Sequence, residues 1–289
     1  MTRPRQVAIV GAGQVGTMVG AALLGAGPGA GIRSVALYDK EPGVAAASVA
    51  LGGGELVLPG PDGVLGADTI VLAMPVTEIL AWVQQFGPRL REGTLLLDTG
   101  SSKVAVVAEM ARRVPPGVHA IGGHPLAGSE AAGPEAAVPG ALRGAVFALC
   151  QSRLDPKAVA LATELVTCLG SRPVVLSAAH HDLVVARTSH LPHLVASALA
   201  AVVAGIGGEP ALSQALVGTG YRSTTRLAAS NSQMVAAFAA SNRAQLEVAL
   251  HEFRQEMDRL EDALAAGPGA LEEALASGRA GRALTLSGS

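Results

Sequence analysis

The feature that most constrains this chain is a glycine-rich loop near its start, Gly11-Ala12-Gly13-Gln14-Val15-Gly16. A short run of β-forming residues, Gln6 to Val10, precedes the loop, and a helical pattern through Leu24 follows it. In this setting the first Gly permits a tight turn, the second lets a pyrophosphate approach the backbone, and the third lets the helix pack closely on the strand. The helix N-terminus then attracts the phosphates. The motif predicts a dinucleotide-binding α/β domain.

A second strand-like run, Ser34 to Tyr38, ends at Asp39. A carboxylate in this position can accept hydrogen bonds from the adenosine ribose hydroxyls, and it repels a 2′-phosphate. We therefore expect NAD as the cofactor, with NADP less favoured. Lys40 is an opposing signal because its cation could tolerate the phosphate. A solvated aspartate at a strand end, without a ligand, is the alternative interpretation.

Strand-like and helical patterns continue to alternate as far as residue 176. Near-continuous apolar strands predict a parallel sheet covered by helices on both faces, with functional loops at the carboxyl ends of the strands. The glycine-rich loop, Asp39, Met74 and Pro75, residues 100–103 and His124 should therefore meet at one edge. The further strands are expected at 68–74, 94–98, 118–122, 143–150 and 172–176, and the helices at 77–90, 104–113 and 156–169.

A loop of small residues, Gly123 to Glu130, is expected after the strand at 118–122. It carries an imidazole, His124, and a carboxylate, Glu130. Titratable groups in loops on a rigid scaffold are typical of catalysis, so His124 is the candidate acid–base residue.

From Ala178 onward the pattern is helical, which predicts two domains, 1–177 with the dinucleotide site and 178–289 built of helices. Offsets of seven and eleven residues place Asp182, Ser189 and His193 on one helical stripe, and Pro192 should kink that helix. A turn at 218–226 carries two arginines and suits an anion. Four histidines within residues 180–193 raise the possibility of zinc, but no ligand set completes a site, so no metal is predicted.

The last long helix has an apolar seam with spacings of three and four residues, which suits either a dimer interface or packing within the domain. We expect the tail after Ala266 to be poorly ordered beyond one short helix. The seam residues are Leu246, Leu250, Phe253, Met257, Leu260 and Leu264.

Composition narrows the partners and the compartment. With 21 basic and 23 acidic residues, the chain shows no sign of a nucleic-acid partner. Two cysteines fit a reducing cytoplasm, and no apolar run reaches the ~20 residues that would span a bilayer. We expect a soluble cytoplasmic protein without a membrane partner.

These segments together resemble the prephenate/arogenate dehydrogenase family along nearly the whole chain. The strings His-Pro-Leu-Ala-Gly-Ser-Glu and Ser-His-Leu-Pro-His, in this order after the glycine-rich fingerprint, are specific to it. The matching segments are Gly11 to Gly16, Asp98 to Lys103, Gly123 to Glu130, His181-Asp182, Ser189 to His193 and Gly218 to Ser230.

The resemblance implies a homodimeric, NAD-dependent oxidoreductase of tyrosine biosynthesis, in which 178–289 is the substrate-binding and dimerisation domain. Its reaction would be the oxidative decarboxylation of prephenate, a cyclohexadiene dicarboxylate, to 4-hydroxyphenylpyruvate. His124 would take the proton of the 4-hydroxyl group while hydride leaves C4, and Ser101 would hydrogen-bond that hydroxyl or His124. The other implied substrate-site residues are Arg226 and His193 for the carboxylates, Glu130 and Asp182 for access to the pocket, and Ser129.

Two departures leave the substrate open, because relatives often carry Asp at the position of Ser223 and Trp at that of Val235. Arogenate, or 4-amino-4-deoxyprephenate in secondary metabolism, are the alternatives. A 3-hydroxyacid or imine-reducing enzyme should carry a catalytic Lys in its second domain, whereas Lys occurs here only at 40, 103 and 157. A non-catalytic NAD sensor is the rival from another class.

Overall fold

The computed structural model describes residues 5–129, 131–205 and 214–287. The chain separates into two compact units, Met1–Asn242 and Arg243–Ser289. The domain boundary expected at residues 177 and 178 stays a prediction.

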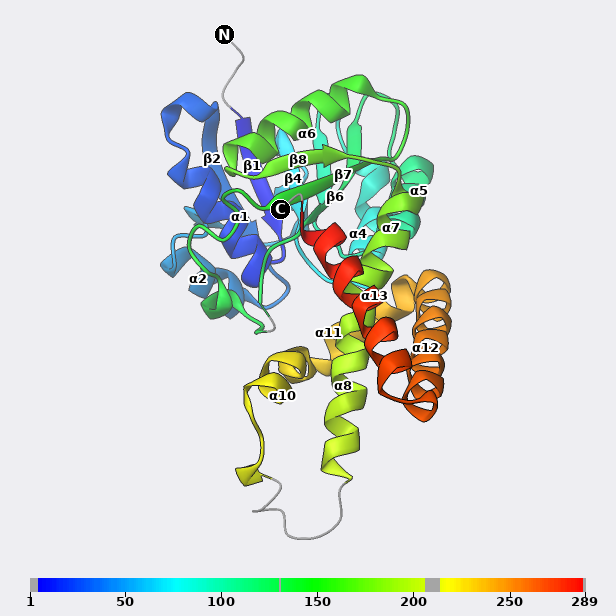
Figure 1. The fold of residues 1–289 in the computed structure, drawn as a ribbon. Coiled ribbons are helices and arrows are strands. Elements are labelled where there is room, and N and C mark those ends of the chain that lie inside the picture. The colour runs from blue at the N-terminus through cyan, green and yellow to red at the C-terminus, as the bar shows by residue number, and fades with distance from the viewer. Residues whose placement is uncertain (1–4, 130, 206–213, 288–289) are drawn as a thin grey trace. The chain divides into compact units, whose positions relative to one another are not determined.

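The first unit is built on one eight-stranded sheet with the order β3-β2-β1-β4-β5-β6-β7-β8 (Figure 1). All neighbouring strands are parallel except β6 and β7. The predicted parallel sheet is thus confirmed with one exception. In the described residues between β6 and β7 the only helical element is a three-residue 3₁₀ turn, η3 (Pro134–Ala136), whereas a parallel return normally needs a crossover helix. The strands are β1 (Arg5–Val10), β2 (Ile32–Tyr38), β3 (Leu56–Val57), β4 (Thr69–Leu72), β5 (Leu95–Asp98), β6 (His119–Pro125), β7 (Val146–Gln151) and β8 (Arg172–Val175).

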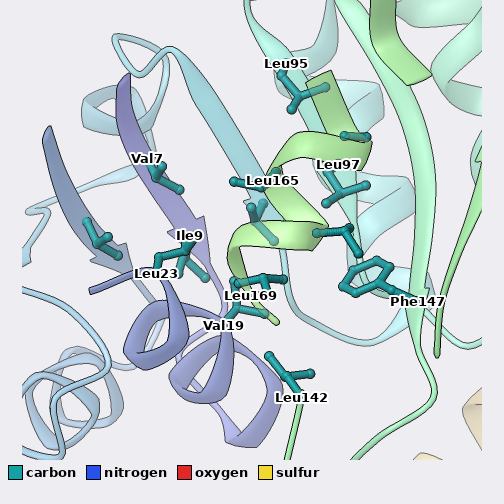
Figure 2. Close-up of a cluster of buried hydrophobic side chains, with 14 of the residues drawn as sticks. Val7, Ile9, Val19, Leu23, Leu95, Leu97, Leu142, Phe147, Leu165 and Leu169 are labelled. Carbon is teal, nitrogen blue, oxygen red and sulfur yellow. The ribbon is translucent and has the colours of Figure 1, made fainter. Parts of the chain in front are cut away.

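Helices cover both faces of this sheet, as the apolar strands require. On one face α1 (Gln14–Gly25), α2 (Pro42–Ala50) and α6 (Pro156–Cys168) bury their apolar side chains, and on the other α3 (Pro61–Val64), α4 (Val76–Phe86) and α5 (Val104–Arg113) do so. Figure 2 shows the first of these cores, in which strand residues such as Ile9 and Leu97 pack against Val19 and Leu23 of α1 and Leu165 of α6. Two further 3₁₀ turns are η1 (Pro28–Ala30) and η2 (Gly87–Arg89).

The rest of the first unit is helical, but its first long helix is not continuous. Helix α7 (Ala178–Val185) passes through a π-helical turn, η4 (Ala186–His190), into α8 (Leu191–Ala204). The predicted kink inside one helix at Pro192 is therefore wrong in detail. The irregular turn lies before the proline, which stands in the first turn of α8, where its missing N–H costs little. The π turn also changes which side chains share a face. Helices α10 (Thr219–Thr224), η5 (Arg226–Ala229) and α11 (Ser232–Ser241) complete the unit.

The second unit is a pair of helices, α12 (Arg243–Ala266) and α13 (Pro268–Leu286), joined at Gly267 with φ of +116°. The expectation of a poorly ordered tail is wrong, because α13 spans 19 residues. Two residues of the predicted seam are well exposed, Met257 at 49% and Leu264 at 66%. Across the described parts of both units, no helix has both the length and the apolar character that crossing a bilayer requires.

Candidate functional site

Each glycine of the glycine-rich loop has a distinct steric reason. Gly11 has φ of +93°, and a Cβ there would lie 2.3 Å from the carbonyl oxygen of Ala73. A Cβ on Gly16 would lie 1.9 Å from the carbonyl oxygen of Gly11, so α1 can approach the loop only without a side chain. At Gly13 a Cβ would meet nothing within 4 Å. The second glycine therefore keeps open a space in front of the N-terminus of α1, as a phosphate group would need.

A cavity of about 770 Å³ lies at the carboxyl ends of the first strands. Five residues predicted to bind the cofactor line it together, namely Gly11, Gly13, Asp39, Met74 and Pro75. Its size and its open glycine cradle fit a dinucleotide. The other predicted cofactor residues have different contacts, since Val15 packs on the core and Gln14 reaches to Ser129.

The carboxylate of Asp39 is fixed at the mouth of this cavity. Its Oδ2 accepts a hydrogen bond from the backbone N of Ala12 at 2.8 Å, and its Oδ1 accepts one from that of Glu41 at 3.0 Å. The neighbouring Lys40 is paired with Glu78, with 2.8 Å between Nζ and Oε1. The positive charge beside Asp39 is therefore already engaged.

His124 is the penultimate residue of β6 and does not lie in the loop after it, which corrects the prediction. Its backbone pairs with Ala148 of β7, so the strand extends to Pro125. The antiparallel partner β7 explains the difference, because it supplies pairing residues beyond the predicted strand end at 122. A strand holds the imidazole more rigidly than a loop would, which favours precise chemistry.

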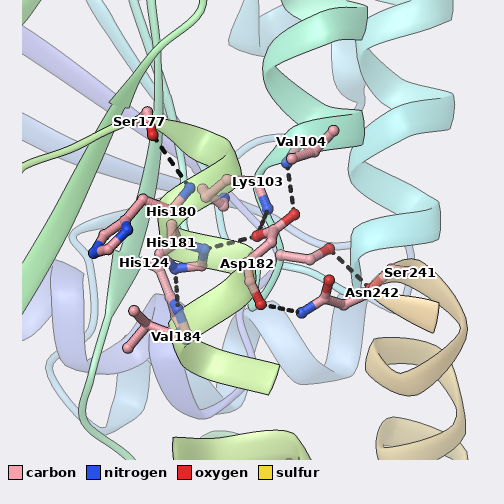
Figure 3. A network of polar contacts seen from close by, with 12 residues as sticks. Lys103, Val104, His124, Ser177, His180, His181, Asp182, Val184, Ser241 and Asn242 are labelled. Atoms are coloured by element: carbon pink, nitrogen blue, oxygen red, sulfur yellow. Dashed lines mark hydrogen bonds and ion pairs between the residues drawn. The ribbon is translucent and has the colours of Figure 1, made fainter. Parts of the chain in front are cut away.

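The ring of His124 is joined to a buried pair at the start of α7 (Figure 3). Its Nδ1 lies 2.9 Å from Nε2 of His181, and Nδ1 of His181 lies 2.7 Å from Oδ1 of Asp182. Both oxygens of Asp182 also accept hydrogen bonds from backbone N–H groups, those of Lys103 at 2.7 Å and Val104 at 2.9 Å. Asp182 is thus buried against the N-terminus of α5, and its role in shaping access to the pocket stays a prediction.

A fully buried ion pair supports the strand that carries His124. The ammonium of Lys103 contacts Asp98 and donates to the carbonyl oxygen of Gly123 at 2.7 Å. Asp98 in turn accepts hydrogen bonds from the backbone N of Gly100 at 2.8 Å and of Gly123 at 3.0 Å. Every charge is paired and hydrogen-bonded, as burial demands. The arrangement ties β5, the following loop and β6 together directly beneath the imidazole.

Burial favours the neutral form of two histidines, His124 and His190. Desolvation holds the pKa of His124 well below its ordinary value, and His181, Lys103 and His190 add to this effect. Burial lowers the pKa of His190 to about 4. A neutral imidazole is the form that can accept a proton, so His124 is poised as a base at neutral pH.

The histidines of the helical segment gather around Phe238. The ring of His190 stacks on Phe238 at 4.6 Å between centroids, and that of His193 meets it edge-on at 5.2 Å. Nδ1 of His193 also lies 3.2 Å from Oγ of Ser230. Arg226 begins η5, which packs against α8, and its side chain is exposed.

Three further predicted site residues are Ser101, Ser129 and Glu130. Ser101 is half-buried in the loop between β5 and α5, and Ser129 is held by Gln14. Glu130 lies outside the described residues. Among those described, no group of three or more His, Cys, Asp or Glu side chains could hold a metal ion.

Sequence reasoning did not assign a role to His181, His190 or Asn242. Nδ2 of Asn242 donates to the carbonyl oxygen of Asp182 at 2.7 Å and lies 3.3 Å from Nδ1 of His190. The dipeptide His181-Asp182 was a visible signal, but its partner His124 is 57 residues away, a contact that no spacing rule reveals.

Comparison with known families gives two adjoining matches. The model described as prephenate dehydrogenase, nucleotide-binding domain, matches residues 29–175. The model described as prephenate dehydrogenase, dimerization domain, matches residues 177–276.

Individual relatives agree with this. The cyclohexadienyl dehydrogenase of Zymomonas mobilis subsp. mobilis is 31% identical over 213 residues, which are 72% of this chain and 71% of that protein. The prephenate dehydrogenase of Lactococcus lactis subsp. cremoris is 29% identical over 201 residues, 68% of this chain but only 55% of that protein. The structure of prephenate dehydrogenase from A. aeolicus in complex with hydroxyphenyl propionate and NAD+ has the same fold, with a TM-score of 0.86 at 24% identity, covering 100% of this chain and 99% of that one.

Proposed function

Because the chain belongs to the prephenate dehydrogenase family, which is a family of oxidoreductases, we propose that it catalyses NAD-dependent oxidative decarboxylation of prephenate to 4-hydroxyphenylpyruvate. The observation that carries the proposal is the place of His124. It lies at the carboxyl end of β6, and the strands from β1 to β6 are all parallel. The histidine and the glycine-rich loop after β1 are therefore at the same edge of the sheet.

The reaction requires one base and one hydride acceptor. The glycine-rich loop and Asp39 would hold NAD, whose nicotinamide would supply the hydride acceptor. His124 removes the proton of the 4-hydroxyl group as C4 loses hydride, which turns the alcohol carbon into a carbonyl carbon. The ring carboxylate then leaves as CO₂, its electron pair completes the aromatic ring, and the resulting phenolate oxygen takes one proton back to give 4-hydroxyphenylpyruvate. Since aromatisation drives this last step, the protein's main tasks are to position C4 and to remove one proton.

The preference for NAD rests on two contacts. Asp39 is held with both oxygens oriented by backbone N–H groups, and its charge would repel a 2′-phosphate. Lys40, the cation that could have tolerated the phosphate, is paired with Glu78. NADP is accordingly the weaker substrate.

The substrate carboxylates would be bound from the helical segment. His193 and Arg226 lie on α8 and on η5, which pack together, and a guanidinium suits a carboxylate because it can donate two parallel hydrogen bonds. The Zymomonas relative is a cyclohexadienyl dehydrogenase by name, so arogenate is the nearest second substrate. Ser223 and Val235, where relatives often have Asp and Trp, leave room for that variation.

The working form is proposed to be a homodimer in the cytoplasm. Residues 177–276 match a model described as a dimerization domain, and the exposed apolar residues of α12 are suited to such an interface. The two cysteines, Cys150 and Cys168, are both free, as a reducing compartment would keep them.

A substrate panel tests the proposal. Prephenate, arogenate and 4-amino-4-deoxyprephenate are each offered with NAD and with NADP while the absorbance of the reduced cofactor is followed. The highest kcat/KM is expected for prephenate with NAD. A preference for either of the other acids would replace the substrate and keep the reaction class. NAD binding without reduction in the presence of any of the three would identify a non-catalytic NAD-binding protein.

A further inference from the structure

Asp182, His181 and His124 form a continuous hydrogen-bonded chain from the N-terminus of α5 to the candidate base (Figure 3). We propose that Asp182 and His181 act as a positioning relay, which fixes the tautomer of His124 and takes up the positive charge when His124 accepts the substrate proton. The inference rests on the proposed function for the origin of that proton. The hydrogen-bonded order Asp182, His181, His124 is observed in the structure and does not depend on that function.

The direction of the hydrogen bonds follows from the backbone. A backbone N–H group can only donate, so Oδ1 of Asp182, 2.7 Å from N of Lys103, and Oδ2, 2.9 Å from N of Val104, are both acceptors. Acceptance at both oxygens is the arrangement that a carboxylate forms, and we take Asp182 in this form. The N-terminus of α5 stabilises that negative charge further through the helix dipole.

The donor and the acceptor of each remaining hydrogen bond, from Asp182 through His181 to His124, are then determined. Because Asp182 can only accept, Nδ1 of His181 must donate to it over 2.7 Å. In neutral His181 the other nitrogen, Nε2, is consequently an acceptor, and Nδ1 of His124 must donate to it over 2.9 Å. His124 is left with a lone pair on Nε2, which is the form required of a base.

Burial and the cationic groups nearby disfavour a proton on His124 before the reaction. Lys103, which precedes α5, and His190 of the π turn are basic groups, and both lower the pKa of His124. The carboxylates that face the same region are Asp98, already neutralised by Lys103, and Asp182 itself. Cys150 of β7 is buried, and burial raises the pKa of its thiol to about 12, so it adds no charge.

Asp182 therefore offers the only nearby unneutralised negative charge among these groups, and it contacts His181. A proton arriving at Nε2 of His124 breaks the substrate O–H bond and forms an N–H bond. The Nδ1–H bond of His124 then breaks as an N–H bond forms at Nε2 of His181. The net result is a neutral His124 and an imidazolium on His181, next to Asp182, where the charge is best stabilised. One proton is taken from the substrate and one positive charge appears on His181, so the transfer balances.

His181 is the residue to vary, because Asp182 also caps α5 and its loss would disturb the fold. His181→Gln can place its amide oxygen near the position of Nε2, so it can accept from Nδ1 of His124 yet cannot take up a proton. His181→Ala removes both abilities. His180→Gln is the matched control, since His180 is an exposed neighbour on the same helix.

The first measurement needs no substrate. Histidine labelled with ¹⁵N in the full-length protein reports tautomers by NMR, and His124→Asn identifies the signals of His124. We expect Nδ1 of His124 to carry the proton and to show scalar coupling across the hydrogen bond to Nε2 of His181, and both features should vanish in His181→Ala. A resting His124 protonated at Nε2 would overturn the relay, whatever the protein's substrate is.

The second measurement is the pH dependence of kcat on the best substrate of the panel. His181→Ala should lower kcat by about 10²-fold with KM for NAD unchanged, since the base is no longer held in its active form. His181→Gln should recover part of that loss but keep a different pH dependence, because His124 must now hold the charge itself. A kcat for His181→Ala within twofold of the parent, or a pH profile for His181→Gln equal to the parent's, would overturn the relay. Inactivity of the parent with every acid would instead refute the proposed function, and the NMR result would still decide the relay.

Discussion

Gln14 of the glycine-rich loop holds Ser129, 115 residues further along the chain, through two hydrogen bonds. Nε2 of Gln14 donates to Oγ of Ser129 at 2.6 Å, and Oε1 accepts from the backbone N of Ser129 at 3.1 Å. The same Nε2 donates to the carbonyl oxygen of Ala136 at 2.8 Å. One side chain thus joins the cofactor loop to the connection that follows His124.

Replacing Gln14 by Ala should loosen this connection, because three hydrogen bonds of about 1 kcal/mol each are lost. We expect the KM values for both NAD and substrate to rise several-fold, with little change in Tm because the contacts are partly exposed. Gln14→Glu is the matched control. It keeps the acceptor for Ser129 but places a negative charge where the pyrophosphate would bind, so KM for NAD should rise most. Unchanged KM values in Gln14→Ala would show that the contact has no role in ligand binding.

Cofactor choice should depend on Asp39 and on the pairing of Lys40. Asp39→Asn removes the charge that repels a 2′-phosphate, so kcat/KM for NAD should fall about tenfold and that for NADP should rise. Glu78→Gln alone should have a smaller effect, since it only releases Lys40. The double variant should use NADP best. Steady-state kinetics with both cofactors measures this, and a parent that uses NADP as well as NAD would contradict the account.

Arg226 should act on substrate binding and not on the cofactor. Arg226→Ala is expected to raise KM for the substrate by at least tenfold while KM for NAD stays near the parent value, because a charged hydrogen-bonding partner of a carboxylate is lost. Arg222→Ala provides the comparison, as Arg222 lies one turn earlier on the exposed side of α10. Equal effects of the two changes would remove Arg226 from the substrate site.

The buried histidines should make the protein less stable in acid. The pKa of His190 falls from 6.5 in the unfolded chain to about 4 in the folded one. Between these values the unfolded state binds a proton that the folded state does not. The free energy of unfolding therefore drops by about 2 kcal/mol from pH 7 to pH 5 on account of His190, and the loss is complete below about pH 4. His124, whose pKa is also lowered, acts in the same direction.

Urea titrations at several pH values measure this effect. His190→Gln should flatten the pH dependence relative to the parent, while loss of stacking on Phe238 lowers the free energy of unfolding at every pH. An identical pH slope in parent and variant would refute the assignment to His190.

Local sequence rules were sufficient for the first half of the fold. The glycines at 11, 13 and 16 have the steric roles that their spacing predicts, and the strand ends bring Asp39 and Met74 to one cavity. These features depend on neighbours close in the chain or on the regular alternation of strand and helix. The antiparallel β7 was not foreseeable in the same way, since it follows a long connection whose described part contains a short 3₁₀ turn and no crossover helix.

The arrangement around His124 could not be predicted from spacing. A helical wheel placed Asp182 with Ser189 and His193, but the π turn at 186–190 interrupts the regular helix. The helical wheel also gave no account of the contact between Asp182 and the start of α5. Lys103 and Val104, which donate to Asp182, precede it by 79 and 78 positions in the sequence. Tertiary packing decides both.

The central claim is that His124 serves as the base in an oxidative decarboxylation, and the stoichiometry of the reaction tests it most directly. The parent and His124→Asn are each incubated with prephenate and NAD, and reduced cofactor, CO₂ and 4-hydroxyphenylpyruvate are measured together. We predict one of each per prephenate consumed by the parent. The variant should have kcat lower by about 10²- to 10⁴-fold and the same Kd for NAD. Reduced cofactor without CO₂, or a His124→Asn variant as active as the parent, would contradict the account.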